Sequence, residues 1–195
     1  MDLDAGMTAG GEVARDVVGK LQDEVGLTGH LALLIEAFNP TWTSGQSYDD
    51  AFLEAADFAR GILVRACRQA HAEAEAQSSV LAAAKKAPDP RVIVLNHKLP
   101  WEKAVFEGGL RDLLFIIYPN EDSTSWYCRT IPPEPSSFGQ RLPLPEAWRG
   151  LQEEEFSQAA GIADGVFCHP SGFICGARSQ GSAVRLAEKA IAAGR

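Results

Sequence analysis

The sequence predicts an α+β protein in which a helical N-terminal part precedes a small mixed β-sheet with flanking helices. Apolar residues recur at helical spacing as far as Lys86. After Pro90 the pattern changes to short β-branched and aromatic runs bounded by turn residues. With 195 residues, 46% of them hydrophobic, the chain can bury a core. We therefore expect a helical connector over residues 1–88 and an α+β substrate-binding domain over residues 89–195.

Three helices are expected before residue 88. Residues 1–11 resemble a loop, and from Glu12 onward apolar residues recur every four positions. A second apolar stripe runs from Leu31 to Phe38 and ends at Asn39-Pro40. The third helix should begin near Ser47, a favourable N-cap, and continue to Lys86 before Pro88 ends it. Its expected core stripe is Phe52, Ala55, Ala59, Ile62, Leu63 and Ala66.

The second half alternates strands with helices. Residues 120–123 have the composition of a hairpin loop. The proline-rich passage from Pro132 to Pro145 lacks any helical or strand period, and its fixed φ angles predict a rigid loop. Short helices are expected at 153–159 and 182–193, and strands at 92–95, 113–118, 126–131, 165–169 and 172–175.

The four cysteines do not have the spacing of a structural zinc site. They are Cys67, Cys128, Cys168 and Cys175. Neighbouring residues on a strand point to opposite faces, so Cys168 and His169 cannot easily ligate one ion. We expect free, mostly buried thiols in a reducing compartment.

The composition of the N-terminus and the net charge of the chain suggest a cellular location and a class of partner. The acidic N-terminus lacks a signal-peptide pattern and no segment is apolar enough to span a membrane, so we expect no membrane partner. The expected location is the cytoplasm in a bacterium, or the nucleus or mitochondrion in a eukaryote. A net charge of −8 disfavours a broad grip on a long duplex. The expected partner is a short RNA 3′ end or a small phosphorylated substrate.

Two segments carry candidate binding residues, although no generic nucleotide-binding or hydrolase motif is present. In the proline-rich passage, Ser136, Arg141 and Arg149 could bind phosphate. The alternative is that both arginines pair with Glu134 and Glu146, while Phe138 and Trp148 anchor the loop to the core.

The second segment runs from Ser171 to Ser182 and leads into the last helix. Small residues such as Gly176 would let backbone N–H groups approach an anion, and Arg178 would add positive charge. A plain strand-to-helix turn would use the same residues, so the spacing leaves both interpretations open.

Four segments together resemble the melanocyte-proliferating-gene (Myg) family of DHH-type phosphoesterases. The most specific is P-x-x-F-x-x-R-L-P-L-P-E-x-W-R-G-L at Pro135 to Leu151. The others, in the family's order, are Asn39 to Trp42, Pro100 to Lys103 and the tail from His169 to Ile191. The resemblance implies a DHH-associated C-terminal domain and a divalent-metal-dependent 3′–5′ exonuclease acting on RNA, with Mn²⁺ or Mg²⁺ as cofactor.

The chain departs from the family in two places. The family's histidine- and aspartate-rich metal motifs are absent, and Asp4, in Asp4-Ala5-Gly6, is the one candidate metal ligand, matched to a D-N-G motif. In the family's G-G-H-R segment this chain has Cys175 to Arg178, so Gly176 and Arg178 match while Ala177 replaces the histidine.

We therefore expect the substrate-binding half of a metal-dependent phosphoesterase, with no catalytic residue of its own and inactive alone. It would be a truncated product, a fragment or one half of a split enzyme whose metals come from a separate DHH-domain polypeptide. The alternative is a stand-alone binding or interaction module without catalysis. An independent hydrolase using Cys175 or His169 is disfavoured because no nucleophile–base pair can be identified.

Overall fold

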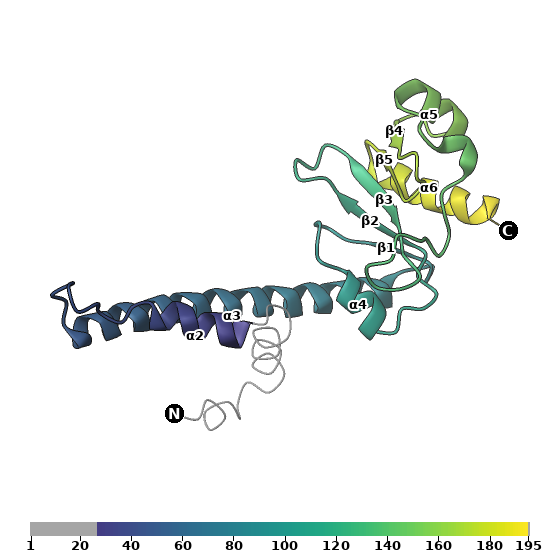
Figure 1. Cartoon of the computed structure of the whole chain (residues 1–195). Coiled ribbons are helices and arrows are strands. Elements are labelled where there is room, and N and C mark those ends of the chain that lie inside the picture. Colours follow the sequence, from purple (N-terminus) through teal and green to yellow (C-terminus); the bar gives the residue numbers. More distant parts are fainter. Residues whose placement is uncertain (1–26, 195) are drawn as a thin grey trace. The chain divides into compact units, whose positions relative to one another are not determined.

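The computed structural model describes residues 27–194, which form two compact units that divide between Glu75 and Ala76 within one long helix. That helix, α3 (Tyr48–Lys86), ends where the sequence predicted (Figure 1). The predicted helix from Glu12, the loop before it and Asp4 all lie outside the described residues. The domain boundary at residue 88 and the role of residues 1–88 as a connector stay predictions.

The first unit contains α2 (Leu27–Glu36) and the N-terminal part of α3. Ser47 caps α3 as expected: its Oγ accepts a hydrogen bond from the Asp50 amide at 3.1 Å. Phe38 stacks on Phe58 with ring centroids 5.3 Å apart. The expected core stripe is only partly right, because Phe52 is 70% exposed although Ala55 is buried. Periodicity shows that a helix has an apolar face but not whether anything covers it.

The second unit is built on a five-stranded sheet with the order β1-β2-β3-β5-β4. Strands β1 and β2 are parallel and the other neighbours are antiparallel, which confirms the predicted mixed sheet and the α+β class. The strands are β1 (Val92–Val94), β2 (Phe115–Pro119), β3 (Trp126–Thr130), β4 (Gly165–Cys168) and β5 (Ile174–Ala177).

Helices pack on both faces of this sheet. The helix α6 (Gln180–Ala193) packs on β1, β2, β3 and β5, and α5 (Glu153–Ala160) packs on β4 (Figure 1). The core on this side includes Phe115, Phe156 and Leu186, all fully buried. On the opposite face, Ile93 and Ile116 pack with Val80 of α3 and with α4 (Glu102–Glu107). The sequence analysis missed α4, which is too short to show a helical period.

The loops agree with the sequence in outline. Residues 120–125 join β2 to β3 as a hairpin, and Asn120 Oδ1 accepts a hydrogen bond from the Ser125 amide. The proline-rich passage contains neither helix nor strand before the 3₁₀ turn η2 (Glu146–Trp148).

Candidate functional site: a partly open sheet face and its arginines

The guanidinium group of Arg141 binds backbone carbonyls. Its Nη1 atom donates to the carbonyl oxygens of Leu110, Arg111 and Leu113 at 2.7, 3.0 and 2.9 Å, and its Cζ lies 5.6 Å from the centroid of the Phe106 ring. Burial lowers the pKa of this arginine. These contacts tie the proline-rich passage to the loop before β2. The alternative interpretation expected a structural role for Arg141, but with Glu134 or Glu146 as its partner rather than backbone carbonyls.

Arg149 also binds a backbone carbonyl, and its contact joins two parts of the proline-rich passage. Its Nε and Nη2 atoms donate to the Leu144 carbonyl oxygen at 3.0 and 2.9 Å. The side chain lies over Gly172, where an added Cβ would be 2.6 Å from Arg149 Nε. Trp148 is buried, as the anchoring interpretation expected, but Phe138 is fully exposed and anchors nothing.

Ser136 and Gly176 occupy very different environments. Ser136 is exposed with a φ of 57°, on the outer part of the proline-rich passage. Gly176 is buried in β5, where it pairs with Tyr127 on one side and Phe167 on the other. A Cβ at Gly176 would be 2.9 Å from Cε1 of Phe167, so glycine is required here to make room for that ring.

Arg178 is the most accessible of the expected arginines. It follows β5 directly, its side chain is 65% exposed, and its Nη2 lies 3.2 Å from Oε2 of the similarly exposed Glu153. The nearby N-terminus of α6 is already capped, because Ser179 Oγ accepts from the Ser182 amide. Burial would raise the pKa of Asp164, but hydrogen bonds from Ser182 and Ser179 outweigh it and lower that pKa. Of the two anion-binding elements expected here, the side chain of Arg178 is therefore the more accessible one, although it is paired with Glu153.

The expected residues do not form one cluster. Arg149 lies at Gly172, before β5, whereas Arg178 lies at the other end of that strand, beyond the pair Ala177 and Trp126. Arg141 is held by the loop that precedes β2. Whether any of them contacts substrate stays a prediction.

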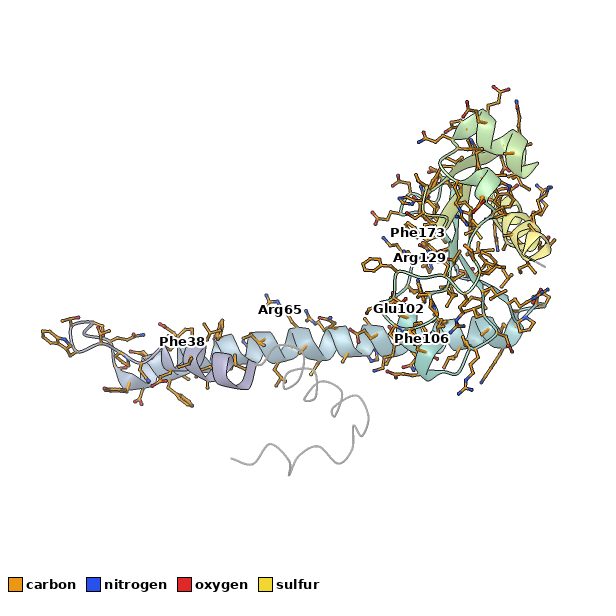
Figure 2. All side chains as sticks on the ribbon, turned by 45° about the vertical axis from the view of Figure 1, so that its right-hand side comes forward. Phe38, Arg65, Glu102, Phe106, Arg129 and Phe173 are labelled. Carbon is orange, nitrogen blue, oxygen red and sulfur yellow. The ribbon has the colours of Figure 1, made fainter. Side chains whose placement is uncertain are left out.

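The sequence analysis missed a group of planar side chains on one sheet face. Cys128, Cys168 and Cys175 lie side by side on the face toward α6 and are buried. The residues that alternate with them, among them Tyr127, Arg129 and Phe167, are partly exposed on the other face. This is the face on which Ile93 and Ile116 are buried, and we call its part on β3 and β4 the open face. Figure 2 shows Arg129 next to Phe173 at this face. The sequence did contain a signal: in both 127–129 and 167–169 a cysteine lies between two planar side chains. Only the strand order shows that these planar side chains share one face of the sheet.

The buried thiols are poor nucleophiles. Burial raises the pKa of Cys168 to about 12. A hydrogen bond with Cys128, together with burial, raises the pKa of Cys175 well above its ordinary value. Both groups stay protonated at neutral pH, so the structure gives no support to a hydrolase that uses Cys175.

Neither a cluster of metal-ligating side chains nor a membrane-spanning helix occurs among residues 27–194. Within residues 27–194, no three histidine, cysteine or acidic side chains are grouped so that they could hold a metal ion. No helix in the same range is long and apolar enough to cross a membrane.

Comparison with known proteins agrees with the resemblance. Residues 3–191 match a family model for MYG1 exonuclease, described as an uncharacterised protein family (UPF0160). The MYG1 protein C694.04c of Schizosaccharomyces pombe is 31% identical over 172 residues, which cover 81% of this chain and 51% of the relative. The MYG1 exonuclease of Homo sapiens is 33% identical over 178 residues, 85% of this chain and 47% of the relative. The chain thus spans about half the length of these relatives, and it belongs to the MYG1 exonuclease family.

Proposed function

We propose that this chain is the substrate-binding half of a divalent-metal-dependent phosphoesterase that removes nucleotides from the 3′ end of RNA. Relatives named exonucleases, aligned over most of the chain, support a nucleic acid substrate. In this proposal Mn²⁺ or Mg²⁺ would be held by a DHH-type domain, on the same or a separate polypeptide, and would supply the activation of water for hydrolysis. The proposed site of action is the cytoplasm in a bacterium, or the nucleus or mitochondrion in a eukaryote.

The observation that carries the proposal is that the Arg178 guanidinium is exposed and held by a single solvent-exposed ion pair among the described residues. Arg178 ends the segment that resembles the family's G-G-H-R motif, and its charged partner among residues 27–194, Glu153, is itself 63% exposed. Exposed ion pairs contribute little free energy, so a phosphate can displace Glu153 at small cost. A guanidinium can then bind two phosphate oxygens at once.

The matched test compares Arg178 with Arg185. Arg185 is also exposed, lies on α6 and donates to the Ser182 hydroxyl at 2.9 Å. Binding of a short single-stranded RNA is followed by fluorescence anisotropy across a salt series. Arg178→Ala should weaken binding and reduce the slope of log K against log salt by about 0.7, the share of one phosphate contact on a single strand. Arg185→Ala should change neither quantity. Equal losses in the two variants would mean a general effect of charge and would contradict the proposal.

The activity of the chain alone is tested separately. We expect the purified chain to release no nucleotides from RNA and to cleave no small phosphodiester, with or without Mn²⁺. Manganese-dependent release that survives purification to homogeneity and disappears on chelation would overturn the proposal that this half only binds substrate.

A non-catalytic interaction module is the second candidate, and one observation favours it. Large apolar side chains are exposed along α2 and α3, including Leu33 at 63%, Phe52 at 70% and Leu53 at 63%. Contiguous exposed apolar residues mark interaction surfaces. A chain that binds no RNA at low salt would favour this candidate over the first.

A further inference from the structure

We infer that the open face of the sheet is a nucleobase-stacking platform, where two rows of planar side chains hold neighbouring bases of a single-stranded substrate. The inference rests on the proposed function, because it names where and how the substrate would be bound. It involves Tyr127, Arg129, Phe167 and Phe173, none of which the sequence analysis singled out.

The first row, which we call the arginine row, is a continuous row of four planar groups in contact, of which Trp101 is buried. The guanidinium carbon of Arg129 lies 5.6 Å from the centroid of the Trp101 ring and 5.5 Å from that of Phe173. The Phe173 ring lies 4.6 Å from that of His169. Three separate segments contribute to this row: the start of α4, strand β3 and the connection from β4 to β5.

The second row, the tyrosine row, lies two residues along β3 from the first. The rings of Tyr118 and Tyr127 have centroids 5.7 Å apart, and those of Tyr127 and Phe167 6.1 Å apart. Gly176, between Tyr127 and Phe167 in the pairing, lets the Phe167 ring lie across the strand. Residues two apart on a strand are roughly 6.5 Å apart, so the rows present separate, adjacent stacking surfaces.

The charge of Arg129 indicates which kind of ligand would bind here. Among the described residues the guanidinium group of Arg129 makes no hydrogen bond or ion pair, and its contacts are the rings of Trp101 and Phe173. It is a fixed positive charge on a partly exposed face of a chain whose net charge is −8. A protein core would leave this charge without a partner, whereas a nucleotide supplies both a phosphate for the charge and a base for the rings.

Other polar groups at the platform fit the same ligand. Arg178 directly follows Ala177, the last residue of β5, so a second positive charge lies just beyond the strand that carries Gly176. The Nδ1 atom of His169 accepts a hydrogen bond from the Ser171 amide at 3.1 Å. In the neutral ring the proton is therefore on Nε2, which leaves a donor for a base or sugar oxygen.

The test separates bases from phosphates. Two single-stranded RNA probes of about six nucleotides are compared by fluorescence anisotropy, one with all bases and one with abasic sites but the same phosphates. Wild-type chain should bind the complete probe about five- to a hundredfold more tightly, the range expected when stacking on an aromatic side chain is gained. Phe167→Leu and Phe173→Leu should each remove a large part of that difference and leave binding of the abasic probe unchanged.

Phe138→Leu is the matched control, because Phe138 is fully exposed and makes no ring contact in the described part of the chain. It should bind both probes like wild type. Arg129→Lys keeps the charge but loses the planar group, so it should weaken binding of the complete probe more than of the abasic one. Thermal melting of each variant shows whether the fold is retained, and Arg129→Lys provides the test if a phenylalanine variant does not fold.

Each outcome has a defined meaning. Equal affinity for the two probes in wild type would overturn the stacking platform and leave the phosphate-binding proposal standing. Equal losses for both probes in the folded Phe167→Leu and Phe173→Leu variants, or losses matched by Phe138→Leu, would also overturn the platform. If neither probe binds at low salt, the platform and the proposed function both fail.

Discussion

Replacing Gly172 by alanine should destabilise the second unit much more than the same change at Gly109. Both glycines have positive φ angles, 65° at Gly172 and 71° at Gly109, so each alanine pays the left-handed backbone cost of roughly 1–2 kcal/mol. The gain from a less flexible unfolded chain is also the same at both positions. The two sites differ in their surroundings. An added Cβ meets Arg149 Nε at 2.6 Å at Gly172, but nothing within 4 Å at Gly109.

The size of the difference follows from the hydrogen bonds of Arg149. To make room, its guanidinium must leave the Leu144 carbonyl, to which Nε and Nη2 donate at 3.0 and 2.9 Å. Hydrogen bonds to charged groups contribute about 1.5–3 kcal/mol. Gly172→Ala should therefore lower the free energy of unfolding by about 2.5–5 kcal/mol, and Gly109→Ala by about 1–2 kcal/mol. In a chain of this size the larger change lowers Tm by roughly 5–20 °C.

Urea unfolding followed by far-UV circular dichroism and tryptophan fluorescence measures both variants. The double variant Arg149→Ala/Gly172→Ala isolates the clash: without the arginine side chain, Gly172→Ala should cost only what Gly109→Ala costs. If Gly172→Ala lies within about 0.5 kcal/mol of Gly109→Ala in the wild-type background, Arg149 does not hold the turn and the argument is wrong.

Four further predictions concern the core and its caps. Under native conditions at pH 8 a thiol reagent should label Cys67 alone, because Cys128, Cys168 and Cys175 are buried, and labelling of two or more thiols would contradict their burial. The pKa of Cys168 is raised to about 12 in the folded chain, so its thiol ionises more readily in the unfolded chain. The contribution of this thiol to stability should therefore be complete below the ordinary thiol pKa and should fall as the pH rises from about 9 toward 12. Wild type and Cys168→Ser are compared by urea unfolding across this pH range, and a contribution that grows with pH would refute the prediction. Arg141→Ala should lower the free energy of unfolding by about 2–4 kcal/mol and should leave the RNA affinity of the folded protein unchanged. A variant that folds with wild-type stability but binds RNA more weakly would show that Arg141 is a binding residue. Ser179→Ala should cost about 1 kcal/mol through loss of the α6 cap, measured by urea unfolding, and no change would show the cap to be redundant.

The sequence by itself determined the features that depend on neighbours along the chain. The end of α3 at Lys86 follows from Pro88, the cap at Ser47 from its hydroxyl, and the hairpin from the turn residues after Pro119. The long Pro135 to Leu151 motif was enough to indicate the family. It also predicted a passage without regular structure, because proline fixes φ and removes hydrogen-bond donors.

Only the tertiary structure decided what depends on pairing between distant segments. The carbonyls that hold Arg141 lie 28 to 31 residues earlier in the chain, so no local pattern distinguishes this structural arginine from a phosphate ligand. The position of β5 between β3 and β4 places Gly176 between Tyr127 and Phe167, and it separates Arg149 from Arg178 by the length of a strand. A strand's own sequence fixes which residues share a face, but its neighbours and their register decide which side chains meet on that face.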